Sequence, residues 1–121
     1  MKVPAHLSCA LGLALLLGCP KDPPPDPVAI QARSLTLSPP DERLADLYAH
    51  SCRACHTVAT SGAPLTGDRV AWRERWDKGM PTLVANAVQG VKGMPAGGQC
   101  VRCTAADLQA LITFMADQDS K

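Results

Sequence analysis

The chain has 121 residues, with 12 Lys or Arg against 11 Asp or Glu and a formal net charge of +1 at pH 7. This balance lacks the basic excess typical of nucleic-acid-binding proteins, so we expect no nucleic-acid partner. Aromatic residues make up only 3% of the chain, so the core that this sequence can build from its own side chains is modest.

The first 18 residues have the pattern of a signal peptide. Lys2 supplies an early positive charge, and residues 7–18 form an apolar run of 12 residues, shorter than the roughly 20 residues that a membrane-spanning helix needs. The run ends in LLGC at residues 16–19, which resembles the lipobox of bacterial lipoproteins. We expect removal of residues 1–18 and acylation of Cys19, which would anchor the protein to a membrane. Ordinary secretion without acylation is the alternative.

Residues 19–38 are predicted to form a tether between the acylated Cys19 and a folded domain. Five prolines occur within residues 20–27, and prolines lack the amide donor that a regular helix needs. At roughly 3 Å per residue, an extended tether over residues 20–38 reaches on the order of 50 Å. We therefore expect a domain on the bacterial cell envelope, lipid-anchored to a membrane and facing the periplasm or the cell exterior.

The remaining residues, 39–121, form one predicted domain, and its most informative segment is CRACH at residues 52–56. Two cysteines three positions apart, followed by a histidine, are typical of the attachment site of a c-type haem. The two thiols bond to the vinyl groups of the porphyrin, and the adjacent imidazole reaches the iron. We expect one covalent haem c held by Cys52 and Cys55, with His56 as an iron ligand.

A second Cys-x-x-Cys pair, Cys100 and Cys103, leaves other interpretations of the cysteines open. Zinc sites usually separate two such pairs by roughly 15 to 20 residues, whereas Cys55 and Cys100 are 45 positions apart. A zinc or dithiol module would also leave His56 without a role. In an oxidising compartment we expect Cys100 and Cys103 to form a disulfide, with a redox-active pair as the alternative.

The domain is predicted to be all-α, because no segment shows the alternation of a strand. Helix starts are indicated by capping residues, and apolar residues follow at helical spacing. The predicted helices run from a capped start at residues 38–41 to Cys52, from Asp68 to Gly79, from Pro81 to Gln89, and from a capping box at Thr104 and Asp107 to Met115.

This order of elements around CRACH resembles the class I c-type cytochromes over residues 39–121, and the late Cys-x-x-Cys pair is similar to that of their small bacterial c-five subgroup. The resemblance implies a small cytochrome c fold of about four helices wrapped around one covalently attached haem. It also implies a carrier of single electrons between redox partners. Such a protein is not an enzyme and has no small-molecule substrate.

The resemblance implies a methionine as the second iron ligand. The tetrapeptide Lys-Gly-Met-Pro occurs at residues 78–81 and again at residues 92–95, so local sequence does not separate Met80 from Met94. The family places its ligand in a loop before the last helix, which implies Met94; Met80 and His50 are the alternatives. A labile sixth ligand would instead indicate a haem-based ligand sensor or a peroxidase-like protein.

Three further residues are implied by the resemblance. The carbonyl of Pro64 is expected to accept the Nδ1 proton of His56 and so to orient the imidazole. Trp72 and Arg75 occupy positions that often contact a haem propionate. The alternative for these two is an apolar core position and a solvated arginine.

Charge is distributed unevenly along the predicted domain. Residues 53–102 contain seven Lys or Arg against three Asp or Glu, whereas residues 39–52 and 104–121 are each acidic by two. We expect the basic part to dock, weakly and in a salt-sensitive manner, on an acidic patch of a redox partner. A solvated surface that docks nothing is the alternative.

Overall fold

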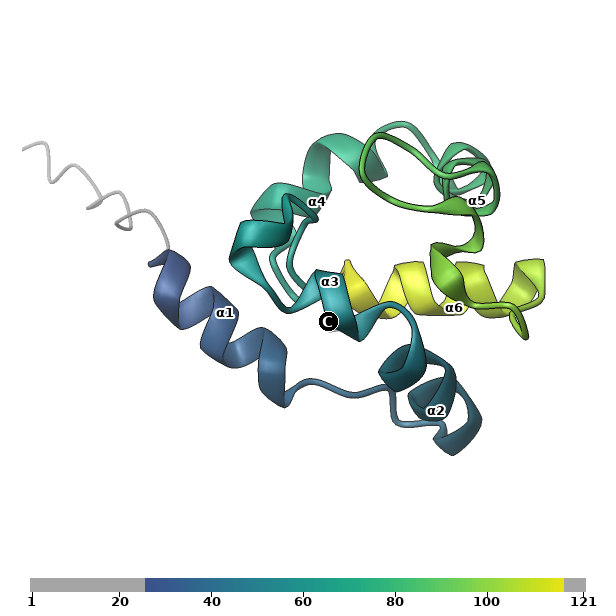
Figure 1. Cartoon of the computed structure of the whole chain (residues 1–121). Helices are drawn as coiled ribbons and strands as arrows, with labels where there is room; N and C mark the ends of the chain where they lie inside the picture. The colour runs from purple at the N-terminus through teal and green to yellow at the C-terminus, as the bar shows by residue number, and fades with distance from the viewer. Residues whose placement is uncertain (1–25, 117–121) are drawn as a thin grey trace, which may run out of the picture.

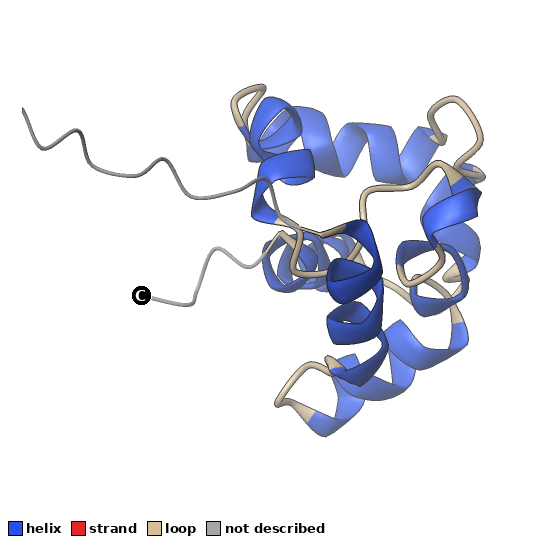
Figure 2. Cartoon of the chain, turned by 90° about the vertical axis from the view of Figure 1, so that its left-hand side faces the viewer, coloured by secondary structure: helices blue, strands red, loops and turns tan. Residues whose placement is uncertain are grey.

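The computed structural model describes residues 26–116 as a set of helices joined by loops, with no strand among these residues (Figure 2). The elements in chain order are α1 (Pro27–Thr36), α2 (Glu42–His50), α3 (Arg53–His56), the 3-10 turn η1 (Ala59–Ser61), α4 (Arg69–Trp76), α5 (Met80–Gln89), the 3-10 turn η2 (Ala96–Gln99) and α6 (Ala105–Met115). The predicted leader, Cys19 and the first part of the tether lie outside the described residues.

Helix α6 lies between α2 and α5 and contacts both (Figure 1). Its apolar stripe supplies much of the core, which is completed by two residues of α2, one of α4 and two of α5. The larger side chains of this core cluster belong to Leu47, Tyr48, Trp72, Leu83, Leu108, Leu111, Ile112 and Met115. The predicted all-α class and the four predicted helices are confirmed, in the form of α2, α4, α5 and α6.

The capping residues that marked these helices in the sequence make the expected hydrogen bonds. The Asp68 carboxylate accepts from the amides of Val70 and Ala71 at 3.1 and 3.0 Å. Thr104 and Asp107 form a complete capping box at the start of α6. Each contact satisfies an amide that has no partner within the helix, which fixes where the helix begins.

The first helix of the predicted domain is shorter than expected. It begins at Glu42, because the cap is Asp41, whose carboxylate accepts from the Leu44 amide at 2.8 Å. It ends at His50, because Ser51 leaves the helical conformation with φ −138° and ψ −77°. The break separates α2 from α3, so the CRACH segment lies on its own helical turn.

The prediction that the extended tether continues to residue 38 is wrong, because residues 27–36 form α1. Pro27 occupies the first helical turn, where a missing amide costs nothing, and Asp26 caps the helix by accepting from the Val28 amide at 3.0 Å. The ten residues that follow Asp26 contain no second proline inside the helix. Among residues 26–116, no helix is both long and apolar enough to cross a membrane.

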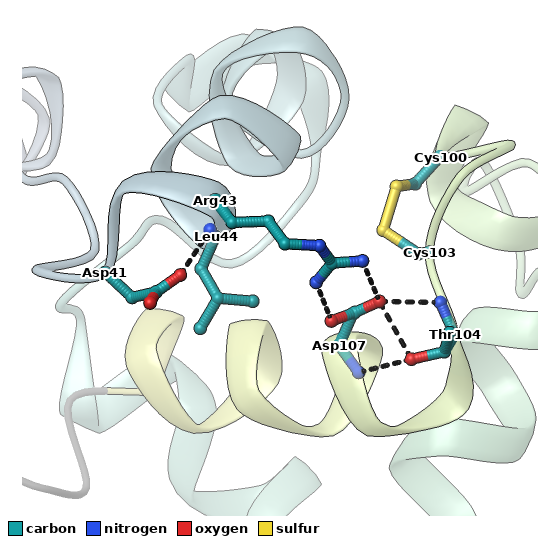
Figure 3. Close-up of polar contacts among 7 residues, drawn as sticks. All are labelled: Asp41, Arg43, Leu44, Cys100, Cys103, Thr104 and Asp107. Atoms are coloured by element: carbon teal, nitrogen blue, oxygen red, sulfur yellow. Dashed lines mark hydrogen bonds and ion pairs between the residues drawn. A yellow bond between two sulfur atoms is a disulfide. The ribbon is translucent and has the colours of Figure 1, made fainter.

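Arg43 and Asp107 form an ion pair that joins α2 to α6 (Figure 3). The guanidinium donates to both carboxylate oxygens, and the second of these contacts is 3.0 Å long. The same carboxylate accepts from the Thr104 amide at 2.8 Å. Asp107 therefore belongs both to the capping box of α6 and to the contact between α2 and α6.

Candidate haem-binding site

The two cysteines and the histidine of CRACH lie on the single turn of α3. The His56 amide donates to the Cys52 carbonyl at 3.0 Å, and residues three and four apart are neighbours on a helix. Both thiols are free of disulfide bonds; Cys52 is buried and Cys55 is exposed. Burial raises the pKa of the Cys52 thiol, although a hydrogen bond with Ser51 opposes this effect.

His56 is buried, and its Nδ1 atom lies 2.8 Å from the carbonyl oxygen of Pro64. A carbonyl oxygen only accepts hydrogen bonds, so Nδ1 carries the proton and Nε2 has a lone pair available for a metal. Burial lowers the pKa of His56; the Pro64 carbonyl raises it and the charge of Arg75 lowers it further. The contact implied for Pro64 is present, and the neutral imidazole is the form that binds iron.

Residues 57–67, here called the His56 loop, carry Pro64 and are bonded to several surrounding elements. The Thr66 amide donates to the His56 carbonyl at 2.7 Å, and the hydroxyls of Tyr48 and Thr66 are 2.9 Å apart. The Gly67 amide donates to the Met115 carbonyl at the end of α6 at 2.7 Å. The pairing of Tyr48 with Thr66 has no local signal in the sequence, since the partners are 18 positions apart.

Trp72 stands beside His56, with ring centroids 5.7 Å apart and an angle of 21° between the planes. Its indole nitrogen donates to the Leu65 carbonyl at 2.9 Å, and the side chain is only 4% exposed. The indole packs against the imidazole and supports the His56 loop. The contact with a haem propionate that the resemblance implied stays a prediction. Arg75 is half-buried, and its Nη1 donates to the Ala71 carbonyl at 2.5 Å.

Residues 90–99, here called the Met94 loop, are held by hydrogen bonds between their own backbone groups. Val91 and Met94 exchange two such bonds, of 3.0 and 2.9 Å. The backbone of Gly90 lies so close to this turn that a Cβ atom there would be 2.8 Å from the Met94 carbonyl oxygen. The Met94 side chain is half-buried, and its Cε atom lies beside Gly98.

Met80 and His50 occupy different surroundings. Met80 begins α5 and lines an open groove, about 480 Å³ in volume, between the first turns of α5 and α6; the groove is lined by Met80, Pro81, Val84, Ala105, Ala106 and Gln109. No CRACH residue contributes to this groove. His50 is exposed, with its Nδ1 2.8 Å from the Asp46 carbonyl oxygen.

Cys100 and Cys103 form a disulfide, as predicted, with Cα atoms 5.4 Å apart. The disulfide lies between the Met94 loop and α6, and Arg102 inside it donates to the Asp46 carboxylate of α2 at 2.6 Å. Within residues 26–116, no cluster of three or more His, Cys, Asp or Glu side chains suits a metal ion. Because Cys100 and Cys103 are paired with each other, their sulfur atoms are not available as zinc ligands.

The residues present fit a covalently attached haem. Two thiols without a disulfide partner and an imidazole with its Nε2 available lie on one helical turn, which is the donor set that covalent attachment and iron ligation require. These residues would hold the haem.

Comparison with known proteins identifies the family. The family described as "Cytochrome C oxidase, cbb3-type, subunit III" matches residues 39–115. A cytochrome c5 of Ectopseudomonas mendocina is 39% identical over 72 residues, covering 58% of this chain and 83% of that protein. A cytochrome c-555 of Chlorobaculum tepidum is 39% identical over 75 residues, covering 59% of this chain and 69% of that protein.

A solved structure described as "Crystal structure of electron transfer complex of nitrite reductase with cytochrome c" contains a similar chain. That chain is 31% identical, with a TM-score of 0.56, and the match covers 64% of this protein and 94% of that chain. Its small helical fold agrees with the one described above. The chain belongs to the monohaem class I c-type cytochromes, with one covalently attached haem c, and is an electron carrier rather than an enzyme.

Proposed function

We propose that the protein carries single electrons at a bacterial membrane surface, with His56 and Met94 as the two side-chain ligands of its haem iron. The observation that carries the proposal is the 2.8 Å hydrogen bond from Nδ1 of His56 to the Pro64 carbonyl, because it fixes the tautomer that offers Nε2 to iron. When bound, the haem supplies an iron that changes between ferric and ferrous states. With His56 and Met94 both as iron ligands, the site would suit electron transfer and would leave no position for an exogenous ligand.

The local surroundings of the two methionines favour Met94 over Met80. Met94 lies in a loop whose backbone is independent of any helix axis, so its side chain can be directed to a metal without moving a helix. Met80 is the first residue of α5, and it lines a groove shared with α6 rather than with α3. Met80 therefore has a structural role in this proposal.

Replacing each methionine in turn tests the assignment. In Met94→Ala the ferric protein should become high-spin, and the ferrous protein should bind carbon monoxide. Met80→Ala, the matched control, should stay low-spin and bind no carbon monoxide. The opposite pattern would contradict the role of Met94, and rapid carbon monoxide binding by the unmodified protein would favour the ligand sensor or peroxidase-like alternative.

Attachment to a membrane is supported by the apolar run and the LLGC sequence at residues 16–19. The Cys100–Cys103 disulfide is consistent with the oxidising space outside the cytoplasm. Mass spectrometry of the membrane fraction should find a new N-terminus at Cys19 with three acyl chains, and Cys19→Ser should release the protein into the soluble fraction. An unmodified Cys19, or release of the unmodified protein by salt alone, would rule out the lipid anchor.

The partner in this proposal is a redox protein with an acidic docking patch. Support comes from the basic excess of residues 53–102, with Arg73, Lys78 and Lys92 exposed, and from the similar cytochrome that is described in complex with nitrite reductase. The anion ferricyanide should oxidise the protein more slowly as ionic strength rises, and Lys92→Glu should lower the rate at low salt. A rate that does not depend on salt would indicate a surface without electrostatic docking.

A further inference from the structure

Helix α1 lies outside the residues that match the cytochrome family, yet two of its side chains are hydrogen-bonded to the loop that follows His56. The family match begins at residue 39, and α1 ends at Thr36. Ser34, in the last turns of α1, has no exposed surface. The helix is therefore part of the folded domain, and its contacts are an addition to the matched region.

Two side chains of α1 bond to backbone groups near the two ends of the His56 loop. The Oε1 atom of Gln31 accepts from the Ala59 amide at 2.7 Å. Nη1 of Arg33 donates to the Gly67 carbonyl at 3.2 Å. In return, Nη2 of Arg53, within CRACH, donates to the Leu35 carbonyl at 3.0 Å.

The contact at Gly67 is also closely packed. A Cβ atom on Gly67 would lie 2.8 Å from Cδ1 of Leu37 and 3.5 Å from Cζ of Arg33. Gly67 has φ +80°, a conformation that side-chain-bearing residues rarely adopt. The end of the His56 loop thus lies between α1 and the last turn of α6, whose Met115 carbonyl accepts from the Gly67 amide.

Pro64, the residue whose carbonyl orients His56, lies between these two points of attachment. We propose that α1 holds the His56 loop in place, and that Gln31 and Arg33 are positioning residues that act on the iron ligand through the Pro64 carbonyl. The inference rests on the proposed role of His56 as that ligand. Gln31 and Arg33 contact the His56 loop. The Pro64 carbonyl of that loop in turn contacts the imidazole of His56.

The physical consequence is a change in reduction potential. A carbonyl that accepts the Nδ1 proton increases electron donation from Nε2, and this favours the ferric state. If the loop loses an attachment, the Nδ1–Pro64 bond becomes longer on average and donation decreases. The reduction potential should then rise, with His56 still bound.

Gln31 is the side chain to change, because it is uncharged and its replacement leaves the charge near the haem unaltered. In the full-length haem-loaded protein, Gln31→Leu removes the acceptor at nearly constant volume. Gln31→Glu retains an oxygen acceptor for the Ala59 amide and serves as the rescue. Gln109→Leu makes the same change at an exposed position of α6 and serves as the matched control.

Gln31→Leu should raise the reduction potential and speed hydrogen exchange of the Ala59 amide, while Gln109→Leu should do neither. Gln31→Glu should restore slow exchange at Ala59, and its potential should not rise, because the added negative charge also favours the ferric state. An unchanged potential in a low-spin Gln31→Leu protein would overturn the inference and leave the proposed ligation intact. Failure of Gln31→Leu to load haem, with Gln31→Glu loading normally, would support a role in holding the loop. A high-spin unmodified protein would contradict the proposed ligation itself.

Discussion

The His56 loop and the Met94 loop differ in what holds them. The first is bonded to side chains or backbone groups of α1, α2, α4 and α6. The second is shaped by hydrogen bonds between its own backbone groups and is followed by a disulfide. The hydrogen bonds that hold the His56 loop thus come from several distant elements, whereas those of the Met94 loop are local, although its side chain also packs against the core.

The largest effect is expected at Gly90. Gly90 has φ +82° and ψ 153°, a conformation essentially restricted to glycine. In Gly90→Ala the new Cβ atom would meet backbone atoms, at 2.8 Å from the Met94 carbonyl oxygen and 2.9 Å from the Ala96 nitrogen. We expect a loss of about 3 kcal/mol in the free energy of unfolding, together with carbon monoxide binding by the ferrous protein as Met94 moves.

Gly79 is the matched control for Gly90, because its φ and ψ are 82° and 152°. The nearest atom to a Cβ on Gly79 is Cδ of Pro81 at 3.8 Å, an ordinary contact. Gly79→Ala should therefore show the backbone strain without the clash, and it should keep a low-spin spectrum. Equal effects of the two variants in urea unfolding would mean that close packing at Gly90 does not hold the Met94 loop.

Removal of the disulfide should have the next largest effect. The double variant Cys100→Ser and Cys103→Ser frees the chain between the Met94 loop and α6. Chain-entropy estimates for so short a loop give a loss of about 2 kcal/mol. Hydrogen exchange should increase at Met94 and stay unchanged at Thr66; equal increases in both loops would remove the distinction between them.

A smaller effect is expected from Trp72→Phe, which tests the contacts that hold the His56 loop. The change leaves the Leu65 carbonyl without the indole donor at 2.9 Å and should cost about 1.5 kcal/mol, the penalty for an unsatisfied buried group. Exchange should increase in the His56 loop and not at Met94. Trp76→Phe, at a half-buried position of the same helix, is the control. An equal loss of stability in that variant would mean that the smaller ring, and not the missing hydrogen bond, causes the effect.

The sequence predicted the elements whose signals are local, and missed those that depend on tertiary contacts. Asp68, Thr104 and Asp107 cap helices through neighbours two or three positions away, so their spacing alone was sufficient. The contact of His56 with Pro64 was implied by family resemblance. The bond from Gln31 to Ala59 spans 28 positions, and no pattern in either segment indicates it.

Helix α1 also changes the predicted reach of the tether. With residues 27–36 helical and packed on the domain, only residues 20–26 remain for an extended segment. If those residues are extended, as the sequence predicts, the expected reach at roughly 3 Å per residue falls to on the order of 20 Å. The proline-rich composition favoured an extended chain throughout, but the prolines stop at the first turn of α1, where Pro27 is compatible with a helix.

The smallest effect concerns the ion pair between α2 and α6, and it is measured as a dependence of stability on pH. The Arg43 guanidinium, together with the Thr104 amide and hydroxyl, holds the pKa of the Asp107 carboxyl well below its usual value of 3.8 (Figure 3). A carboxyl with a lowered pKa in the folded state stabilises the fold above the pKa of the unfolded state, about pH 4. This contribution is lost as the pH falls below that value.

The free energy of unfolding of Asp107→Asn should therefore depend less steeply on pH between about pH 4 and pH 2 than that of the unmodified protein. Urea unfolding of the haem-loaded proteins at a series of pH values measures the slope. Asp77→Asn, at the end of α4, is the control for the loss of one carboxyl. Because protonation of His56 affects all three proteins alike, the difference between their slopes isolates Asp107. Parallel slopes for Asp107→Asn and the unmodified protein would mean that the contact between α2 and α6 does not depend on this charge.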